Sequence, residues 1–232
     1  TERENSEQMR REFTANVSHE LRTPLHSISG YAELLKNGMV KSGDVKPVAT
    51  KIYDEAQRMV RLVEDIINLS HLDEGAEDMI KEEVDLYDIV SSTIESLSPE
   101  AEAAGVTVSF SGRHVSVNGI SQLLSGIVYN LCDNAIKYNR QGGSVSVSLS
   151  SEDKDAVLTV SDTGIGIPTE HQQRIFERFY RVDKSHSKEV GGTGLGLSIV
   201  KHAAKIHDAK IKLSSVPDQG TEITVIFPKS LS

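Results

Sequence analysis

Two long stretches in the first 73 residues carry apolar side chains at helical spacing, with few strand formers. The first covers residues 3–40, and the second begins near Pro47, which the first turn of a helix tolerates. A hairpin of two helices has too little core to be stable by itself, so both apolar stripes must be covered. We expect two copies to pair as a four-helix bundle through residues 3–73. Packing against the rest of the same chain is the alternative.

The pattern changes to strands mixed with helices after about Lys81. Short alternating stretches predict half-buried strands at 106–110, 145–149, 156–160 and 221–226, and helical patterns lie near 86–97, 119–139 and 194–207. Gly75 ends the second helix of the hairpin, which places a boundary near 75–81. The sequence therefore predicts an α+β chain, in which a helical hairpin at residues 1–76 is followed by an α/β layer domain at residues 77–232.

Composition excludes several classes of protein. The formal net charge of −9 and the absence of basic runs argue against a nucleic-acid partner. Cys132 is the sole cysteine, so an internal disulfide cannot form, which fits a reducing compartment. No apolar run is long enough to span a bilayer. Residues 1–4 read like the middle of a helix, so we expect further sequence upstream.

His19 lies on the polar face of the first predicted helix, opposite an apolar stripe. Glu20 follows it directly, and a carboxylate beside an imidazole can accept the proton of one ring nitrogen and leave the other as a nucleophile. Thr23, one turn further on, offers a hydroxyl that could hold a water molecule. Pro24 should kink the helix within a turn of His19. An ordinary surface histidine and a tolerated bend are the alternatives. The apolar stripe consists of Phe13, Val17, Leu21, Leu25, Ile28, Tyr31 and Leu35.

Polar groups on the helix near 119–139 indicate a cation and phosphate site. Asn130 and Asn134 are four residues apart and share one helix face, although asparagine is a poor helix former. Amide oxygens suit a hard cation such as Mg²⁺. Lys137 adds a positive charge for phosphate. The alternative, that these are surface polar residues, is plausible for Lys137 and less so for the asparagines.

Two glycine-rich segments flank an aromatic one. Asp162 ends a predicted strand, and its carboxylate could accept a hydrogen bond from an amine such as adenine N6, while Gly164 and Gly166 permit close ligand approach. Residues 191–200 open a helix with glycines whose N–H groups suit phosphate. Between them, the aromatic segment 174–183 precedes a polar stretch at 184–190, which suggests a lid. The alternative, when each segment is taken singly, is that they are only a turn, a short amphipathic helix and a loop.

Together these segments resemble the sensor histidine kinases of two-component signalling. Residues 13–25, Phe-Thr-Ala-Asn-Val-Ser-His-Glu-Leu-Arg-Thr-Pro-Leu, look like the H-box of that family. The next four segments follow the order of its N-box, first glycine box, F-box and second glycine box. The resemblance covers essentially the whole chain. It implies a dimerisation and phosphotransfer hairpin followed by a two-layer Bergerat ATP-binding domain.

The resemblance also implies a role for each site residue. His19 matches the phosphoacceptor, Glu20 its acid/base partner, and Thr23 the position that orients water in dephosphorylation. Asn134 matches the Mg²⁺ ligand, with Asn130 in support. The remaining matches are to nucleotide-contacting or lid positions: Lys137, Tyr138, Asp162 (the adenine reader), Gly164, Gly166, Arg181, Gly192, Thr193, Gly194, Leu195, Gly196 and Leu197.

The implied activity is autophosphorylation of His19 from Mg·ATP, followed by transfer to an aspartate of a response regulator and dephosphorylation of that regulator. The implied location is the cytoplasmic portion of a membrane-anchored receptor whose sensor and membrane segments lie upstream. An ATPase of the gyrase or chaperone class is one alternative, but such proteins lack an H-box. A dimeric scaffold with a degenerate site is another, and the intact boxes argue against it. Residues 206–209, Ile-His-Asp-Ala, depart from the usual His-Gly-Gly, which affects a turn.

Overall fold

A computed structural model of the chain describes residues 2–73, 79–152, 155–182 and 192–228. The chain divides into two compact units, residues 1–68 and 69–232, which are described here one at a time. The predicted domain boundary at residues 76 and 77, the helix stop at Gly75 and the lid at 184–190 fall outside the described residues.

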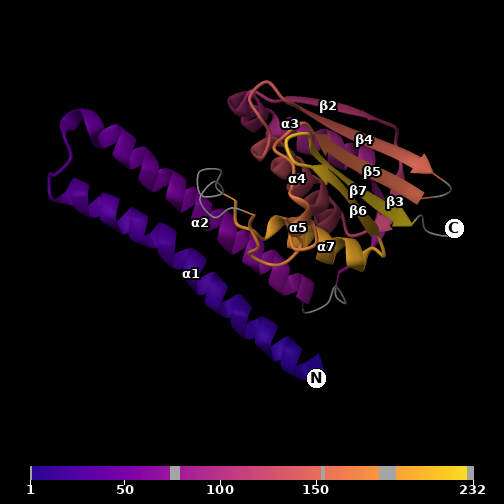
Figure 1. Cartoon of the computed structure of the whole chain (residues 1–232), viewed down its shortest axis with the longest axis horizontal. Helices are drawn as coiled ribbons and strands as arrows, with labels where there is room; N and C mark the ends of the chain where they lie inside the picture. The colour runs from indigo at the N-terminus through magenta and orange to yellow at the C-terminus, as the bar shows by residue number, and fades with distance from the viewer. Residues whose placement is uncertain (1, 74–78, 153–154, 183–191, 229–232) are drawn as a thin grey trace. The chain divides into compact units, whose positions relative to one another are not determined.

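The first unit is a helical hairpin. Helix α1 spans Glu2–Lys36, a short 3-10 helix, η1, spans Ser42–Asp44, and helix α2 spans Val45–Asp73 (Figure 1). Pro24 lies inside α1, as its position in the sequence predicted, and its side chain is buried. Proline has no N–H to donate to the carbonyl of Glu20, so one helical hydrogen bond is missing at this point.

Much of the apolar surface of the hairpin is open in a single chain. Leu25 of the predicted apolar stripe is 52% exposed, and the other stripe residues are only partly buried. Further large apolar side chains of both helices are exposed, namely Leu34, Tyr53, Val60, Val63 and Ile67. A hairpin with this much uncovered apolar surface needs a further packing partner.

The second unit is built on a five-stranded mixed sheet in the order β2-β4-β5-β7-β6. Strands β2 and β4 pair in parallel, and the other neighbours are antiparallel. A second, two-stranded sheet pairs β1 with β3. The bounds are β1 Glu82–Asp85, β2 Thr107–Gly112, β3 Ser116–Gly119, β4 Ser144–Glu152, β5 Asp155–Asp162, β6 Lys210–Val216 and β7 Gly220–Pro228.

Three helices cover one face of the larger sheet (Figure 1): α3, Leu86–Ala104; α4, Ser121–Lys137; and α7, Gly196–Ile206. Buried side chains alternate with half-buried or exposed ones along β4, and with half-buried ones along β5, because one face of the sheet packs against the helices. The core between the layers includes Leu124, Ile127, Val147, Leu158 and Phe227.

This architecture confirms the predicted fold class, a helical hairpin followed by a two-layer α/β sandwich. All four predicted strands and all three helical patterns are present. The short strands β1 and β3, the edge strand β6, and the one-turn helix α5, Thr169–Gln172, were not predicted.

Candidate functional site

Helix α4 carries the predicted cation and phosphate ligands on a partly buried face. Asn130 donates from Nδ2 to the carbonyl of Gly126 at 2.8 Å, which leaves its Oδ1 as an acceptor. Asn134 is half-buried, and its side-chain amide makes no hydrogen bond to the described residues. Its carbonyl oxygen therefore fits the donor type that Mg²⁺ prefers. Lys137 Nζ lies 2.6 Å from Asp133 Oδ2, so its charge is held one turn from Asn134.

Asp162, at the end of β5, is held in a fixed orientation by two backbone donors. The N–H groups of Gly164 and Thr221 donate to the same oxygen, Oδ1, at 2.8 and 3.2 Å. The other oxygen, Oδ2, is thus directed away from the backbone and can accept from a ligand amine. Burial raises the pKa of Asp162, and the two hydrogen bonds oppose that shift. The carboxyl group is half-buried, and the two hydrogen bonds hold it in one orientation.

Three close contacts between segments that are far apart in the sequence bring the predicted boxes together. A Cβ atom at Gly196 would lie 2.5 Å from Asn130 Oδ1, and one at Gly192 would lie 3.1 Å from the hydroxyl of Tyr138. Gly164 packs against the carbonyl of Tyr138, which accepts from Ile165 N at 3.1 Å. The second glycine segment therefore lies against α4 and against Tyr138, which follows that helix, and the first glycine segment also lies against Tyr138.

The aromatic segment is hydrogen-bonded to the second glycine segment through the backbone. Phe179 N donates to the carbonyl of Gly194 at 2.8 Å, and a Cβ at Gly194 would lie 3.3 Å from Cγ of Arg181. His171 and Tyr180 contact one another at 2.6 Å through Nδ1 and the hydroxyl. These contacts hold Phe179, Tyr180 and Gly194 in place; residues 183–191 lie outside the described part of the chain.

The N-terminus of α7 lies in the segment for which the sequence predicted a phosphate cradle. Gly196 is the first residue of the helix, Leu195 before it is fully buried, and Leu197 is half-buried in the first turn. Leu195 N donates to Thr193 Oγ1 at 3.3 Å. Unpaired N–H groups and the helix dipole at such an end favour an anion.

Gly166 is the one predicted glycine that does not approach the other boxes. It has a φ of +67° and packs against the backbone of Val216, at the end of β6. Its role is to let the loop after Asp162 pass close to this strand, since a Cβ would collide with the Val216 carbonyl.

In the separate hairpin unit, His19 is the most accessible of the predicted site residues. Its side chain is 77% exposed, as the predicted polar face requires. Its Nδ1 lies 4.0 Å from Glu20 Oε1. The hydroxyl of Thr23 donates to the carbonyl of His19 at 3.3 Å, which leaves the lone pairs of the hydroxyl oxygen for a water molecule.

Two contacts, one within each unit, were not predicted. Glu20 Oε2 lies 3.7 Å from Arg58 on α2, and Asn139 links α4 to the loop after Asp162. Asn139 Nδ2 donates to the carbonyls of Ala135 and Ser144, and its Oδ1 accepts from Thr163 Oγ1 at 3.3 Å. The signal for Asn139 was its position directly after Tyr138; Arg58 gave no local signal, because its contact depends on how the two helices pair.

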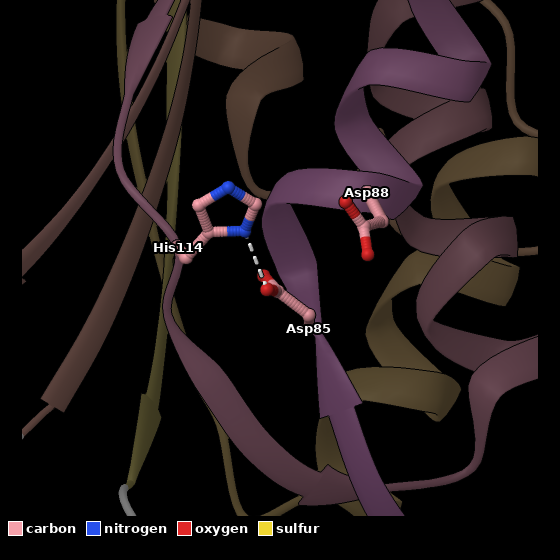
Figure 2. A group of neighbouring side chains, drawn as sticks. All are labelled: Asp85, Asp88 and His114. Atoms are coloured by element: carbon pink, nitrogen blue, oxygen red, sulfur yellow. Dashed lines mark hydrogen bonds and ion pairs between the residues drawn. The ribbon is translucent and has the colours of Figure 1, made fainter.

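A separate cluster of side chains that could bind a metal ion is explained by structural contacts. Asp85, Asp88 and His114 offer atoms within 4.8 Å of one another (Figure 2). Asp85 caps α3 by accepting from Tyr87 N at 2.9 Å, and it pairs with His114 Nδ1 at 2.7 Å. His114 also stacks on Tyr87, with ring centroids 4.4 Å apart. These contacts account for the helix cap and the loop position, so the cluster needs no ion.

Family models match both units. Residues 9–75 match the His Kinase A (phospho-acceptor) domain, and residues 119–231 match the Histidine kinase-, DNA gyrase B-, and HSP90-like ATPase family. The ATPase family includes three classes of protein, and the phospho-acceptor domain upstream selects one of them. The chain belongs to the sensor histidine kinases of bacterial two-component systems. No helix among the described residues of this histidine kinase is long and apolar enough to cross a membrane.

The relatives of this kinase domain pair are longer proteins. Sensor histidine kinase WalK of Bacillus subtilis (strain 168) is 36% identical over 232 residues, which are 98% of this chain and 38% of WalK. Sensor-like histidine kinase SenX3 of Mycobacterium tuberculosis (strain H37Rv) is 40% identical over 96% of this chain and 54% of SenX3. The chain thus spans about two fifths to one half of these relatives.

A solved structure shares the fold. Histidine kinase ThkA in complex with response regulator protein TrrA matches with a TM-score of 0.75 at 20% identity, over 99% of this chain and 66% of that one.

Proposed function

We propose that this chain binds Mg·ATP in its second unit, transfers the terminal phosphoryl group to His19, and passes it to an aspartate of a response regulator. The observation that carries the proposal is the approach of Asn130 and Tyr138 to Gly196, at the start of α7, and to Gly192, which precedes that helix. An exposed histidine beside a carboxylate in the hairpin supplies the acceptor. The response regulator is supported by the fold shared with ThkA, which was solved with its partner TrrA.

Each part of the proposed nucleotide site has a distinct task. Asp162 Oδ2 accepts from the exocyclic amine of adenine, and the N–H groups at the start of α7 receive phosphate oxygens. Asn134 supplies an oxygen to Mg²⁺, with Asn130 beside it. A bound Mg²⁺ ion would supply charge neutralisation on the phosphates, while the protein residues would position them. Lys137, which pairs with Asp133 in this structure, would turn to the phosphates and balance their remaining negative charge.

In the transfer step, the lone pair of one ring nitrogen of His19 forms a bond to the γ-phosphorus. The bond from that phosphorus to the bridging oxygen breaks, and its electrons leave with ADP. The imidazole gains positive charge, and the proton on its other nitrogen moves towards Glu20. Nδ1 faces Glu20, so we assign Nε2 as the nucleophile.

Incubation with γ-labelled ATP tests this proposal directly. We expect acid-labile label on the unaltered chain and none on His19→Ala, with nucleotide binding retained by both. His26→Ala is the matched control, because His26 lies on the same helix and is also exposed. Label that persists in His19→Ala would move the acceptor elsewhere. ATP hydrolysis without protein-bound label would favour the gyrase-type ATPase alternative.

Dephosphorylation of the response regulator is a second proposed activity of the same helix face. It requires a water molecule aligned behind phosphorus and no histidine nucleophile. The Thr23 hydroxyl lies one turn from His19 and keeps free lone pairs. Thr23→Ala should retain autophosphorylation and lose phosphatase activity, whereas Glu20→Ala should impair the kinase first. Equal loss of both activities in Thr23→Ala would show that this residue supports the helix beside Pro24.

We also propose that two hairpins pair through residues 3–73 and that the chain is the cytoplasmic portion of a membrane-anchored receptor. Pairing is supported by the exposed apolar side chains of α1 and α2. The receptor assignment is supported by relatives named as sensors, in which the matched region is only part of the protein.

A further inference from the structure

A guanidinium on α2 stands beside the carboxylate next to the proposed phosphoacceptor. Arg58 is 14% exposed, and its Nη2 lies 3.7 Å from Glu20 Oε2. Its Nη1 lies 4.0 Å from Oε2 of Glu55. Glu20 and Glu55 are 28% and 29% exposed. The group is therefore partly shielded from water, and charges in such a position are screened less than they are on an open surface.

The two oxygens of Glu20 face different partners. Oε1 is the atom nearest His19, at 4.0 Å from Nδ1, and Oε2 is the atom nearest Arg58. The imidazole is 77% exposed, so packing does not fix the ring. In contrast, Arg58 is largely buried and belongs to the other helix. The orientation of the Glu20 carboxylate relative to His19 is thus tied to α2 through Arg58.

We propose that Arg58 is a positioning residue for the kinase reaction, which rests on the proposed function. It holds Glu20 by one oxygen, so that the other oxygen can meet the Nδ1 proton of His19 as Nε2 attacks phosphorus. Closing the gap from 4.0 Å to hydrogen-bond distance needs only a small rotation of the His19 and Glu20 side chains. Arg58 touches neither ATP nor the imidazole in this scheme and acts through Glu20 alone.

Glu55 gives the pair a second constraint. Its Oε2 is buried and makes no hydrogen bond to any described atom, so Arg58 is its near counter-ion. The guanidinium is planar and offers donors in a fixed fork, which suits a bridge between two carboxylates. A lysine at position 58 would keep the charge without the fork, so it would restore part of the function only.

Single-turnover autophosphorylation of the full chain tests the proposal. Arg58→Gln should lower the rate at saturating ATP by about tenfold, a part of what acid–base positioning contributes, and leave the KM for ATP unchanged. Arg58→Lys should recover part of that loss. Arg61→Gln is the matched control, because Arg61 lies one turn further along α2, is exposed and has no ion pair with a described residue.

A double-substitution cycle separates positioning from a general structural role. If Arg58 acts through Glu20, then Glu20→Gln with Arg58→Gln should be no slower than Glu20→Gln alone. The ¹⁵N shifts of His19 should also change in Arg58→Gln and stay constant in Arg61→Gln. The proposal would be overturned if the rate losses of the two single variants multiply in the double variant. An unaltered rate in Arg58→Gln would overturn it as well. If the unaltered chain takes up no label, the proposed function itself fails instead.

Discussion

At the scale of single residues, the fixed orientation of Asp162 supports its proposed role in selecting the base. Its Oδ1 accepts from the N–H groups of Gly164 and Thr221, which lie far apart in the sequence. The sequence predicted Asp162 and the glycines that follow it, since both stand in one short motif. It did not predict Thr221, because the pairing of β5 with β7 is what brings that residue to the site.

Asp162→Asn should weaken nucleotide binding and reduce the preference for ATP over GTP. An amide can donate as well as accept at the position of Oδ2, so a base with a carbonyl at its edge is no longer rejected as strongly. Titration of both nucleotides into both proteins measures the change, with Asp155→Asn at the start of β5 as the control. Equal use of ATP and GTP by the unaltered chain would remove Asp162 from base selection.

A buried histidine should make folding stability depend on pH. His207 Nδ1 donates to the carbonyl of Ala203 at 2.7 Å, and its Nε2 accepts from Ile120 N at 2.9 Å, so both nitrogens are used by the neutral ring. Burial lowers the pKa of His207; the bond to Ala203 and the charge of Asp208 oppose this, and the charge of Lys81 adds to it. Protonation would break the bond from Ile120.

The direction in which stability changes with pH follows from the lowered pKa of His207. Above about pH 6.5 the ring is neutral both folded and unfolded, and its contribution is complete. As pH falls below this value the unfolded state binds the proton first, so the free energy of unfolding decreases down to the folded pKa. Urea unfolding between pH 5 and 8 should show this slope, and His207→Gln should flatten it. Exposed His26 provides the control, since His26→Gln should leave the slope in place.

At the scale of secondary-structure elements, the ends of helices α3 and α7 show how far the local sequence predicts where a helix terminates. Helix α3 ends at Gly105 with a φ of +65°, the usual conformation of a terminating glycine. Helix α7 ends differently. Asp208, which stands where the family usually has glycine, has a φ of +52°. The turn itself was expected, and the backbone conformation that Asp208 must adopt there follows from the fit of α7 to β6.

Asp208→Gly should therefore stabilise the chain by about 1 kcal/mol, because glycine adopts this conformation without the penalty of a side chain. Asp208→Ala should destabilise it, since alanine lacks the polar group that helps aspartate tolerate positive φ. Urea midpoints at neutral pH measure both changes. A lower midpoint for Asp208→Gly would mean that the charge next to His207 matters more than the backbone.

At the scale of the whole chain, periodicity predicted the long elements and missed the short ones. The 35-residue α1 and 29-residue α2 carry enough apolar positions to be recognised, and β4 and β5 alternate clearly. Strands β1 and β3 have four residues each, too few for a pattern, and they exist because they pair with one another. Arg58 was missed for the same reason, since contacts across a hairpin leave no local signature.

Pairing of hairpins is the prediction that belongs to this scale. Light scattering should report a dimer at micromolar concentration. Val60→Glu with Val63→Glu should shift the population towards monomer, because both side chains are exposed apolar groups of α2 and charges there would oppose burial. Tyr129→Glu, an exposed position on α4, serves as the control. A monomer from the unaltered chain would overturn the four-helix bundle.

The pairing of β7 with β5 has a further consequence during synthesis on the ribosome. A nascent chain that already contains α4, β5 and the start of α7 still lacks Thr221, and so cannot hold Asp162 from both sides. Gly220, with a φ of +110°, must also arrive before the backbone can pass against the carbonyl of Asp162. We therefore expect nucleotide binding to begin only after residues 220–228 have emerged, long after the proposed acceptor His19 has been made.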